Sequence, residues 1–199
     1  MLFNLLPAFA DDFQFFNLFR YLTFRAGGAV ITALILSFVL GPSLIRWLKK
    51  KQGEGQPIRE DGPESHLLTK RGTPTMGGVL ILFSLTVSTL LWADLSNPYV
   101  WTVLLVTGGF GMIGFADDYL KLTKRNTKGL PGKLKLAAQF VISGRAAAVI
   151  MTTADPALAT GVSVPFFKDL LIDLGILFIP FAMIVMTGSS NAVNLTDGL

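Results

Sequence analysis

Long stretches without charge dominate this sequence. Four windows of 20 to 23 residues contain no Asp, Glu, Lys or Arg, and they lie between Arg25 and Arg46, Arg71 and Asp94, Asp94 and Asp117, and Asp173 and Asp197. A fifth apolar run, near residues 134–153, is interrupted by Arg145. A helix that crosses a bilayer needs about 20 apolar residues. Each window is therefore long enough to cross a membrane once.

This pattern predicts an all-α, polytopic integral membrane protein. Strands are not expected, because the windows are continuously apolar, whereas a strand of a membrane barrel alternates apolar and polar residues. Residues 1–24 hold an aromatic run without the basic start of a signal peptide, which favours an N-terminal interfacial segment. Residues 25–199 form the predicted transmembrane domain, with five helices near 25–47, 77–93, 98–116, 134–153 and 174–192.

Basic residues gather in two loops and set the predicted orientation. Residues 46–71 hold seven Lys or Arg and residues 117–135 hold six, whereas the opposite loops have none in 94–97 and only Lys168 in 154–173. The positive-inside rule places the two basic loops in the cytoplasm. The N-terminus is then outside, and the last helix ends at the cytoplasmic face.

Composition agrees with a membrane protein. Of the 199 residues, 51% are hydrophobic and 15% are charged, and the mean hydropathy is +0.57. A soluble domain carries roughly 25% charged residues. The sequence contains no cysteine, which excludes a disulfide, a thiolate metal site and a cysteine nucleophile within it. The net charge of +4 belongs to loops that face lipid headgroups, so we expect membrane lipids and no nucleic acid as partners.

Three polar clusters fall on the predicted cytoplasmic side, and the first is the pair Asp117 and Asp118 at the end of the third predicted span. Adjacent carboxylates at a membrane edge are costly unless they are hydrated, paired or bound to metal. They could take a proton from a nucleophile or hold Mg²⁺ beside a phosphate. They could equally cap the span as a solvated helix end beside Lys121. The sequence leaves both interpretations open.

The second and third clusters are residues 70–78 (KRGTPTMGG) and 191–199 (NAVNLTDGL). Cations, hydroxyls and glycine backbone in the second indicate an anion or nucleotide contact, although an ordinary boundary between loop and span fits equally well. In the third, Asn191 and Asn194 share one side of a helix and Asp197 follows three residues later. Because such polar groups are costly at a membrane edge, we favour a site there. Arg145 and the single histidine, His66, receive no role.

At these clusters the sequence resembles the phospho-N-acetylmuramoyl-pentapeptide-transferase family, whose members are membrane enzymes of bacterial peptidoglycan synthesis. RGTPTMGG and NAVNLTDGL are the specific strings, whereas the wider superfamily of polyprenyl-phosphate sugar-1-phosphate transferases shares the aspartate pair but not the first string. The strings that carry the resemblance keep the family's order, at residues 61–66, 71–78, 115–119, 127–130, 165–168 and 191–199.

The resemblance implies a fold of about ten membrane helices, of which this chain would hold about half. It implies a Mg²⁺-dependent transfer of phospho-MurNAc-pentapeptide from UDP-MurNAc-pentapeptide to undecaprenyl phosphate, which gives lipid I and UMP. It also implies an active site on the cytoplasmic face of the bacterial inner membrane and a possible homodimer. Asp117 would be the base or orienting carboxylate, with Asp118 beside it. The implied substrate-binding residues are Lys70, Thr75, Asn191, Asn194, Asp197, Gly198 and Leu199, with Asn194 also in the metal shell.

Length is the main departure from the family, whose members are about twice as long and continue the second string beyond Leu199. We therefore expect the chain to be incomplete at its C-terminus, to lack a later metal-binding aspartate and a histidine-rich loop, and to be inactive alone. Two alternatives remain open, another polyprenyl-phosphate sugar-1-phosphate transferase and a small polytopic transporter with Arg145 in its pathway. An intramembrane prenyltransferase is disfavoured, because Tyr119, Leu120 and Lys121 follow the aspartate pair where further acids would be needed.

Overall fold

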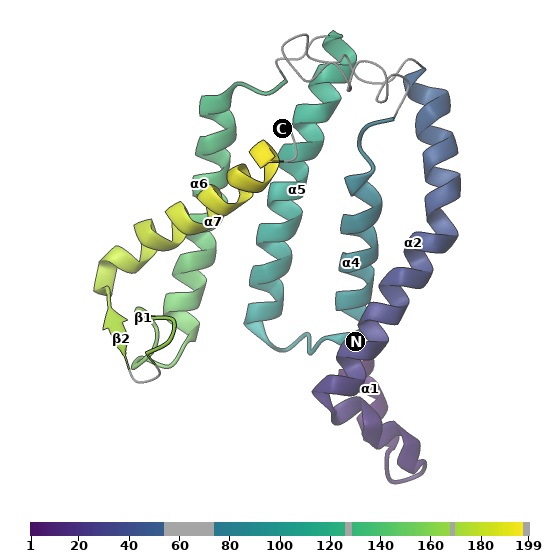
Figure 1. The fold of residues 1–199 in the computed structure, drawn as a ribbon. Helices are drawn as coiled ribbons and strands as arrows, with labels where there is room; N and C mark the ends of the chain where they lie inside the picture. Colours follow the sequence, from purple (N-terminus) through teal and green to yellow (C-terminus); the bar gives the residue numbers. More distant parts are fainter. Residues whose placement is uncertain (54–73, 126–128, 168–169, 197–199) are drawn as a thin grey trace. The chain divides into compact units, whose positions relative to one another are not determined.

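The computed structural model describes residues 1–53, 74–125, 129–167 and 170–196 (Figure 1). The chain divides into two compact units, Met1–Gly129 and Leu130–Leu199. The predicted residues Lys70, Asp197, Gly198 and Leu199 lie outside the described residues, as does His66.

The first unit consists of short helical turns followed by three long helices. Helix α2 packs along α4, and α4 also packs against α5 (Figure 1). In chain order the elements are α1 (Leu2–Leu5), the 3-10 turns η1 (Leu6–Phe9) and η2 (Gln14–Arg20), α2 (Leu22–Gln52), α4 (Gly78–Trp92) and α5 (Pro98–Lys124).

Local sequence explains where these helices begin and end. Helix α2 ends in three lysines, which complement the negative end of the helix dipole, and then at Gly53, whose φ of 59° suits glycine. Helix α5 starts with Pro98 after Asn97, whose side chain accepts a hydrogen bond from the Tyr99 amide at 2.9 Å. Arg125 closes α5 in the left-handed conformation.

Helices α2 and α4 meet along a seam of small and polar residues. The Trp92 indole lies so close to Gly28 that any Cβ there would overlap its ring. The indole nitrogen donates to Thr32 Oγ1 at 2.9 Å, and Ser37 donates to Ser84 at 3.3 Å. Small residues and interhelical hydrogen bonds of this kind hold helices together where lipid removes the hydrophobic driving force.

The N-terminal turns carry a cluster of aromatic rings. Phe19 stacks on Trp92 with 5.6 Å between ring centroids, and Phe24 contacts both rings edge-on. Phe13 and Phe15 are largely exposed. Rings that project from the end of a membrane helix suit the headgroup region, so an interfacial role for residues 1–24 remains our prediction.

The second unit is a helix pair joined by a short hairpin. Helix α6 (Gly132–Thr153) packs against α7 (Phe178–Thr196), which follows the 3-10 turn η3 (Gly175–Leu177). Strands β1 (Gly161–Ser163) and β2 (Leu171–Asp173) pair antiparallel, with Gly161 opposite Asp173 (Figure 1).

The hairpin departs from the all-α prediction, although the described chain is mostly helical. It lies in the connection 154–173, outside the charge-free windows on which that prediction rested. The Asp173 carboxylate accepts hydrogen bonds from the Thr160 hydroxyl and, at 2.9 Å, from the Gly175 amide. These bonds fix the end of the hairpin. Each strand has only three residues, which is too short for an alternating pattern to predict it from the sequence.

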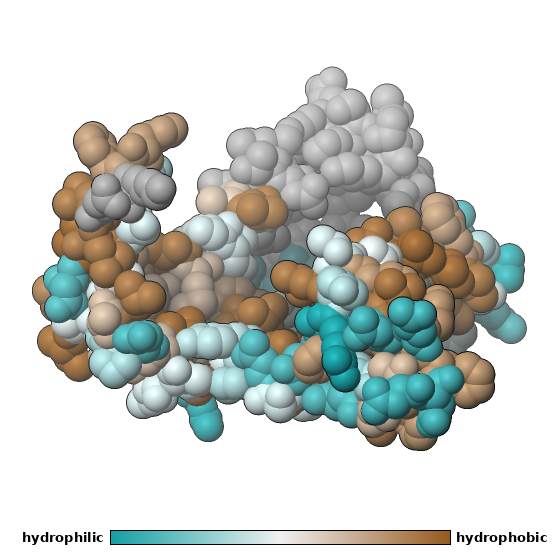
Figure 2. Space-filling model, turned by 90° about the horizontal axis from the view of Figure 1, so that it is seen from below, coloured by the Kyte–Doolittle hydropathy of each residue, from teal (hydrophilic) through white to brown (hydrophobic). Residues whose placement is uncertain are grey.

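Among the described residues, four helical segments are long and apolar enough to cross a membrane, namely Leu22–Gln52, Pro98–Lys124, Gly132–Thr153 and Gly175–Val193. Helix α4 is apolar but has 15 residues, about 22 Å at 1.5 Å per residue, against a hydrocarbon core of about 30 Å. The predicted count of five spans is therefore not confirmed. Figure 2 shows apolar residues (brown) exposed over much of the visible surface, as expected of an integral membrane protein.

Candidate functional site

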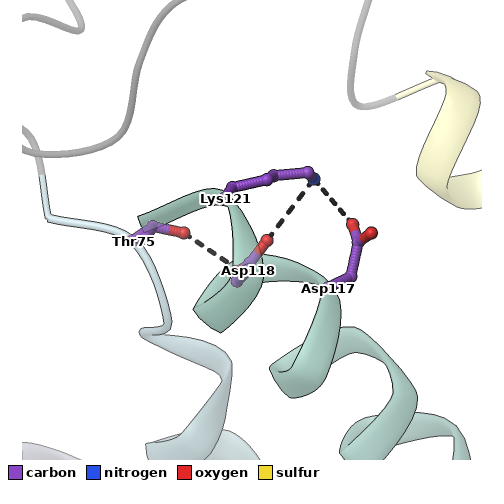
Figure 3. Close-up of polar contacts among 4 residues, drawn as sticks. All are labelled: Thr75, Asp117, Asp118 and Lys121. Atoms are coloured by element: carbon purple, nitrogen blue, oxygen red, sulfur yellow. Dashed lines mark hydrogen bonds and ion pairs between the residues drawn. The ribbon is translucent and has the colours of Figure 1, made fainter. Parts of the chain in front are cut away.

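A polar cluster lies on the last turns of α5 and on the segment that leads into α4 (Figure 3). The Lys121 ammonium is 2.6 Å from Asp117 Oδ2 and 3.7 Å from Asp118 Oδ1. The Thr75 hydroxyl donates to Asp118 Oδ2 at 3.0 Å. The structure thus brings together three of the predicted site residues, Thr75, Asp117 and Asp118, and adds Lys121 to them.

Helix α5 positions both carboxylates. The apolar window predicted a helix end near residue 116, but the helix continues to Lys124. Lys121 follows Asp118 by three residues and Asp117 by four, which places it on the same face of the helix as both carboxylates. Charged residues end the apolar window without ending the helix, because pairs at this spacing support helical structure.

The segment before α4 holds Thr75 in place through its backbone. The Thr75 amide donates to Gln52 Oε1 at 2.8 Å, and the Thr75 carbonyl accepts from Gln52 Nε2 at 3.0 Å. The next residue, Met76, has a φ of 70°, which is uncommon outside glycine. Gln52 is the last residue of α2, so the end of that helix and the site are directly connected.

Gly129 closes the cluster on its other side. Its φ is 57°, and a Cβ added there would overlap Asp117 Oδ1 and crowd the Lys121 side chain. Only glycine accommodates both the backbone conformation and this close approach. The backbone of Gly129 therefore lies directly against the ion pair.

The cluster keeps one negative charge when both carboxylates and the ammonium are ionised. The side chains of Asp117 and Lys121 are 15% and 16% exposed, and that of Asp118 is 32% exposed. Solvent can thus reach Asp118 more readily than the pair beside it. A partly exposed, net negative group of this kind can bind a cation or accept a proton from a bound substrate.

The donor set fits Mg²⁺ when a substrate supplies phosphate oxygens. Mg²⁺ is usually held by one or two carboxylates together with substrate phosphates and water, rather than by an all-protein cage. Asp117 and Asp118 provide two carboxylates on adjacent residues. Within the described ranges no group of three His, Cys, Asp or Glu residues is close enough together to hold a metal by itself.

Asn191 lies in the second unit, on α7. Its side-chain amide donates to Gln139 Oε1 and to the Thr187 carbonyl, each at 2.8 Å. Gln139, Ser143 and Thr187 are buried between α6 and α7, at 2%, 0% and 4% exposure. Asn191 thus takes part in a polar seam between the two helices. Its predicted role in substrate binding stays a prediction, as does that of Asn194, which lies on α7 but whose side chain is outside the described part.

Lys121 and Gln52 differ in how far the sequence indicates their contacts. The sequence places Lys121 beside the aspartates, and its three- and four-residue spacing to them is the signal for the ion pairs. Gln52 carries no such signal, because it follows a run of lysines and lies 23 residues before its partner Thr75.

The third span also contains a string, GFGMIG, that matches a dinucleotide-binding pattern. Within it, Gly111 lies against Leu82 of α4, where a Cβ would overlap the leucine side chain. This is the close helix packing expected of small residues in a membrane helix.

Two family models match parts of the chain. The model of glycosyl transferase family 4 matches residues 100–199, and the phospho-N-acetylmuramoyl-pentapeptide-transferase signature 1 matches residues 70–82. The first match contains both aspartates and the second contains Thr75.

Two relatives carry the name phospho-N-acetylmuramoyl-pentapeptide-transferase. The protein of Granulibacter bethesdensis is 64% identical over 199 residues, which are all of this chain and 55% of the relative. The protein of Maricaulis maris is 55% identical over 204 aligned residues, which cover all of this chain and 56% of the relative. The chain spans about half the length of the curated relatives it matches. By the match to residues 100–199, which is half of the chain, the chain belongs to glycosyl transferase family 4, and by the signature and these relatives it is similar to the phospho-N-acetylmuramoyl-pentapeptide-transferases.

Proposed function

We propose that the whole protein transfers phospho-MurNAc-pentapeptide from UDP to undecaprenyl phosphate, giving lipid I and UMP. An oxygen of the lipid phosphate forms a bond to the phosphorus that carries the sugar, and the bond from that phosphorus to the oxygen of UMP breaks. The observation that carries the proposal is the hydrogen bond from Thr75, within the matched signature, to Asp118, within the matched family region.

The carboxylates would act on the lipid phosphate. A phosphate monoester has a second pKa near 6, so part of the lipid carries a proton that a carboxylate can accept or bind. Asp117, held by Lys121 at 2.6 Å, is the proposed base or orienting group, and Asp118 lies beside it. Lys121 can neutralise negative charge that develops on the diphosphate during transfer.

Mg²⁺ is the proposed cofactor, and Asp117 and Asp118 would hold it, with Asn194 as a further proposed ligand. When bound, it would neutralise the diphosphate of the nucleotide substrate. The protein's own groups would meanwhile fix the carboxylates, through Lys121 on one side and Thr75 on the other.

The site would face the cytoplasm of a bacterium at the inner membrane. The chain has helices that are long and apolar enough to cross a membrane, and it is similar to two bacterial transferases. The aspartates follow the apolar part of α5. The basic residues that flank this end favour the cytoplasmic side. An acceptor with a lipid tail and a phosphate head suits a site at that depth, because the head then lies at the level of the carboxylates.

Substitution of either aspartate in the whole protein tests the proposal. Vesicles that contain the protein, undecaprenyl phosphate and Mg²⁺ receive UDP-MurNAc-pentapeptide, and UMP release is measured. We expect Asp117→Asn and Asp118→Asn to lower kcat by about 10²- to 10⁴-fold, the usual contribution of a proton-transfer group. Asp12→Asn, at an exposed aspartate of the N-terminal segment, is the matched control and keeps full activity.

Wild-type protein that inserts normally but releases no UMP would contradict the proposal. Activity of both aspartate variants at the level of Asp12→Asn would contradict the assigned roles. Parallel assays with UDP-N-acetylglucosamine distinguish the alternative of another polyprenyl-phosphate sugar-1-phosphate transferase, which would prefer that donor.

A further inference from the structure

The side chain of Gln52 binds both polar groups of the Thr75 backbone. Its carbonyl oxygen accepts from the Thr75 amide at 2.8 Å, and its amide nitrogen donates to the Thr75 carbonyl at 3.0 Å. The two bonds form a closed, amide-to-amide pair of the kind that joins neighbouring strands. A pair with two bonds fixes orientation as well as distance, which a single hydrogen bond does not.

The position of this pair connects it to the carboxylates. Thr75 uses its backbone for Gln52 and its hydroxyl for Asp118, at 3.0 Å, so one residue joins the end of α2 to the end of α5. Figure 3 shows the hydroxyl directed at the carboxylate. Rotation or displacement of the Thr75 backbone would move this hydroxyl away from Asp118.

The backbone around Thr75 needs support. Met76 has a φ of 70°, a conformation that is unfavourable for a non-glycine residue. Strained residues persist where surrounding contacts over-determine them, and they gather at functional sites. Helix α4 begins two residues after Met76, at Gly78, and the Gln52 pair holds the segment on the other side of the strain.

We propose that Gln52 is a positioning residue of the transferase site, which acts by holding Thr75 so that its hydroxyl fixes Asp118. The proposal rests on the proposed function, because the reaction is what Asp118 serves. The hydrogen bonds of the Gln52 side chain to described residues go to the Thr75 backbone. Its effect on the reaction therefore passes through Thr75.

A double-mutant cycle in the whole protein tests this route. Gln52→Leu removes both bonds with little change in size, and Thr75→Val removes the hydroxyl while it keeps the backbone. A lost hydrogen bond is worth a factor of about 3 to 12. Because the effect passes through the single bond from Thr75 to Asp118, we expect Gln52→Leu to lower kcat/KM by about 3- to 12-fold. If Gln52 acts through the Thr75 hydroxyl, the double variant will be no more than about threefold worse than the poorer single variant.

The control is Gln14→Leu, the same substitution at an exposed glutamine of the N-terminal segment, which we expect to be fully active. Effects of Gln52→Leu and Thr75→Val that multiply in the double variant would overturn the proposal, since a general structural role gives independent losses. Wild-type activity of Gln52→Leu would also overturn it. If Gln52→Leu fails to fold, Gln52→Asn replaces it, because its amide is one methylene too short for the pair.

Hydrogen exchange separates this inference from the proposed function. The Thr75 amide donates to Gln52, so we expect peptides that contain Thr75 to exchange faster in Gln52→Leu than in wild type. If these peptides exchange at the same rate in Gln52→Leu and in wild type, the hydrogen-bonded pair of Gln52 and Thr75 is contradicted, whether or not the variant is active. Faster exchange together with an inactive wild-type protein would support the pair and contradict the proposed reaction.

Discussion

Replacement of Gly129 by alanine separates the geometry of the aspartates from the stability of the fold. Gly129 has a φ of 57°, and its Cα lies so close to the ion pair that a Cβ would overlap Asp117 Oδ1 and crowd Lys121. The substitution therefore adds a single methyl group at the point where Asp117 and Lys121 meet. It leaves every charge in place.

Two costs are expected, and they affect different measurements. A non-glycine residue in the left-handed region costs about 1 to 2 kcal/mol, which lowers the free energy of unfolding. The overlap adds a displacement of the Asp117 carboxylate, because the methyl group and the oxygen cannot occupy the same space. A displacement of about 1 Å in a catalytic group can cost about 100-fold in rate. We expect Gly129→Ala to lower kcat by about 10- to 100-fold.

Gly53→Ala is the matched control. Gly53 has a φ of 59°, close to that of Gly129, but nothing lies within 4 Å of the Cβ position. In the whole protein, both variants should lower the melting temperature, whereas only Gly129→Ala should also lower the rate of the proposed release of UMP from UDP-MurNAc-pentapeptide. Equal kcat in the two variants would refute the reasoning, because backbone strain alone would then explain both.

Two further predictions concern stability. Gly28→Ala should be less stable than Gly27→Ala by about 1 to 3 kcal/mol, the usual cost of overpacking, because a Cβ at residue 28 would overlap the Trp92 ring. Gly27 has open space around it, so Gly27→Ala reports the effect of the added methyl group alone in the same thermal melts. The pKa of Asp173 lies below its usual 3.8 because the Thr160 hydroxyl, and then the Gly175 amide, donate to its carboxylate. The ionised carboxylate therefore stabilises the fold fully above pH 3.8, and this stabilisation is lost as the pH falls through the lowered pKa. Between pH 5 and pH 3 the melting temperature of Thr160→Val should therefore fall less than that of wild type. An equal fall in both proteins would contradict this.

Within the described residues, the charge-free windows located α2, α4, α5 and α7, and the interrupted apolar run located α6, but neither signal gave the helix ends. The window after Asp94 was expected to end in a helix terminus near residue 116, yet α5 runs to Lys124 because the charged residues pair along one face. The window after Arg71 is longer than the helix inside it, because α4 starts only at Gly78. Absence of charge reports contact with lipid, whereas helix ends depend on caps and on glycine and proline.

The candidate site was predictable in its parts and not in its assembly. Asp117, Asp118 and Thr75 were each singled out from local residue types. That Thr75 contacts Asp118, 43 residues away, depends on how α4 packs against α5, which no short pattern encodes. Gln52 could not be found at all, because its side chain bonds the backbone of Thr75, and any residue type would offer the same backbone groups.

The charge of the site argues for how its substrates must arrive. Asp117, Asp118 and Lys121 sum to one negative charge, and they lie on the C-terminal turns of α5, where the helix dipole adds about half a negative charge. Two phosphate-bearing substrates would be repelled by such a group. They bind more readily if positive charge accompanies them. The negative cluster is then suited to a divalent cation brought with the nucleotide, which is why we expect the reaction to depend on Mg²⁺ and to be lost on chelation.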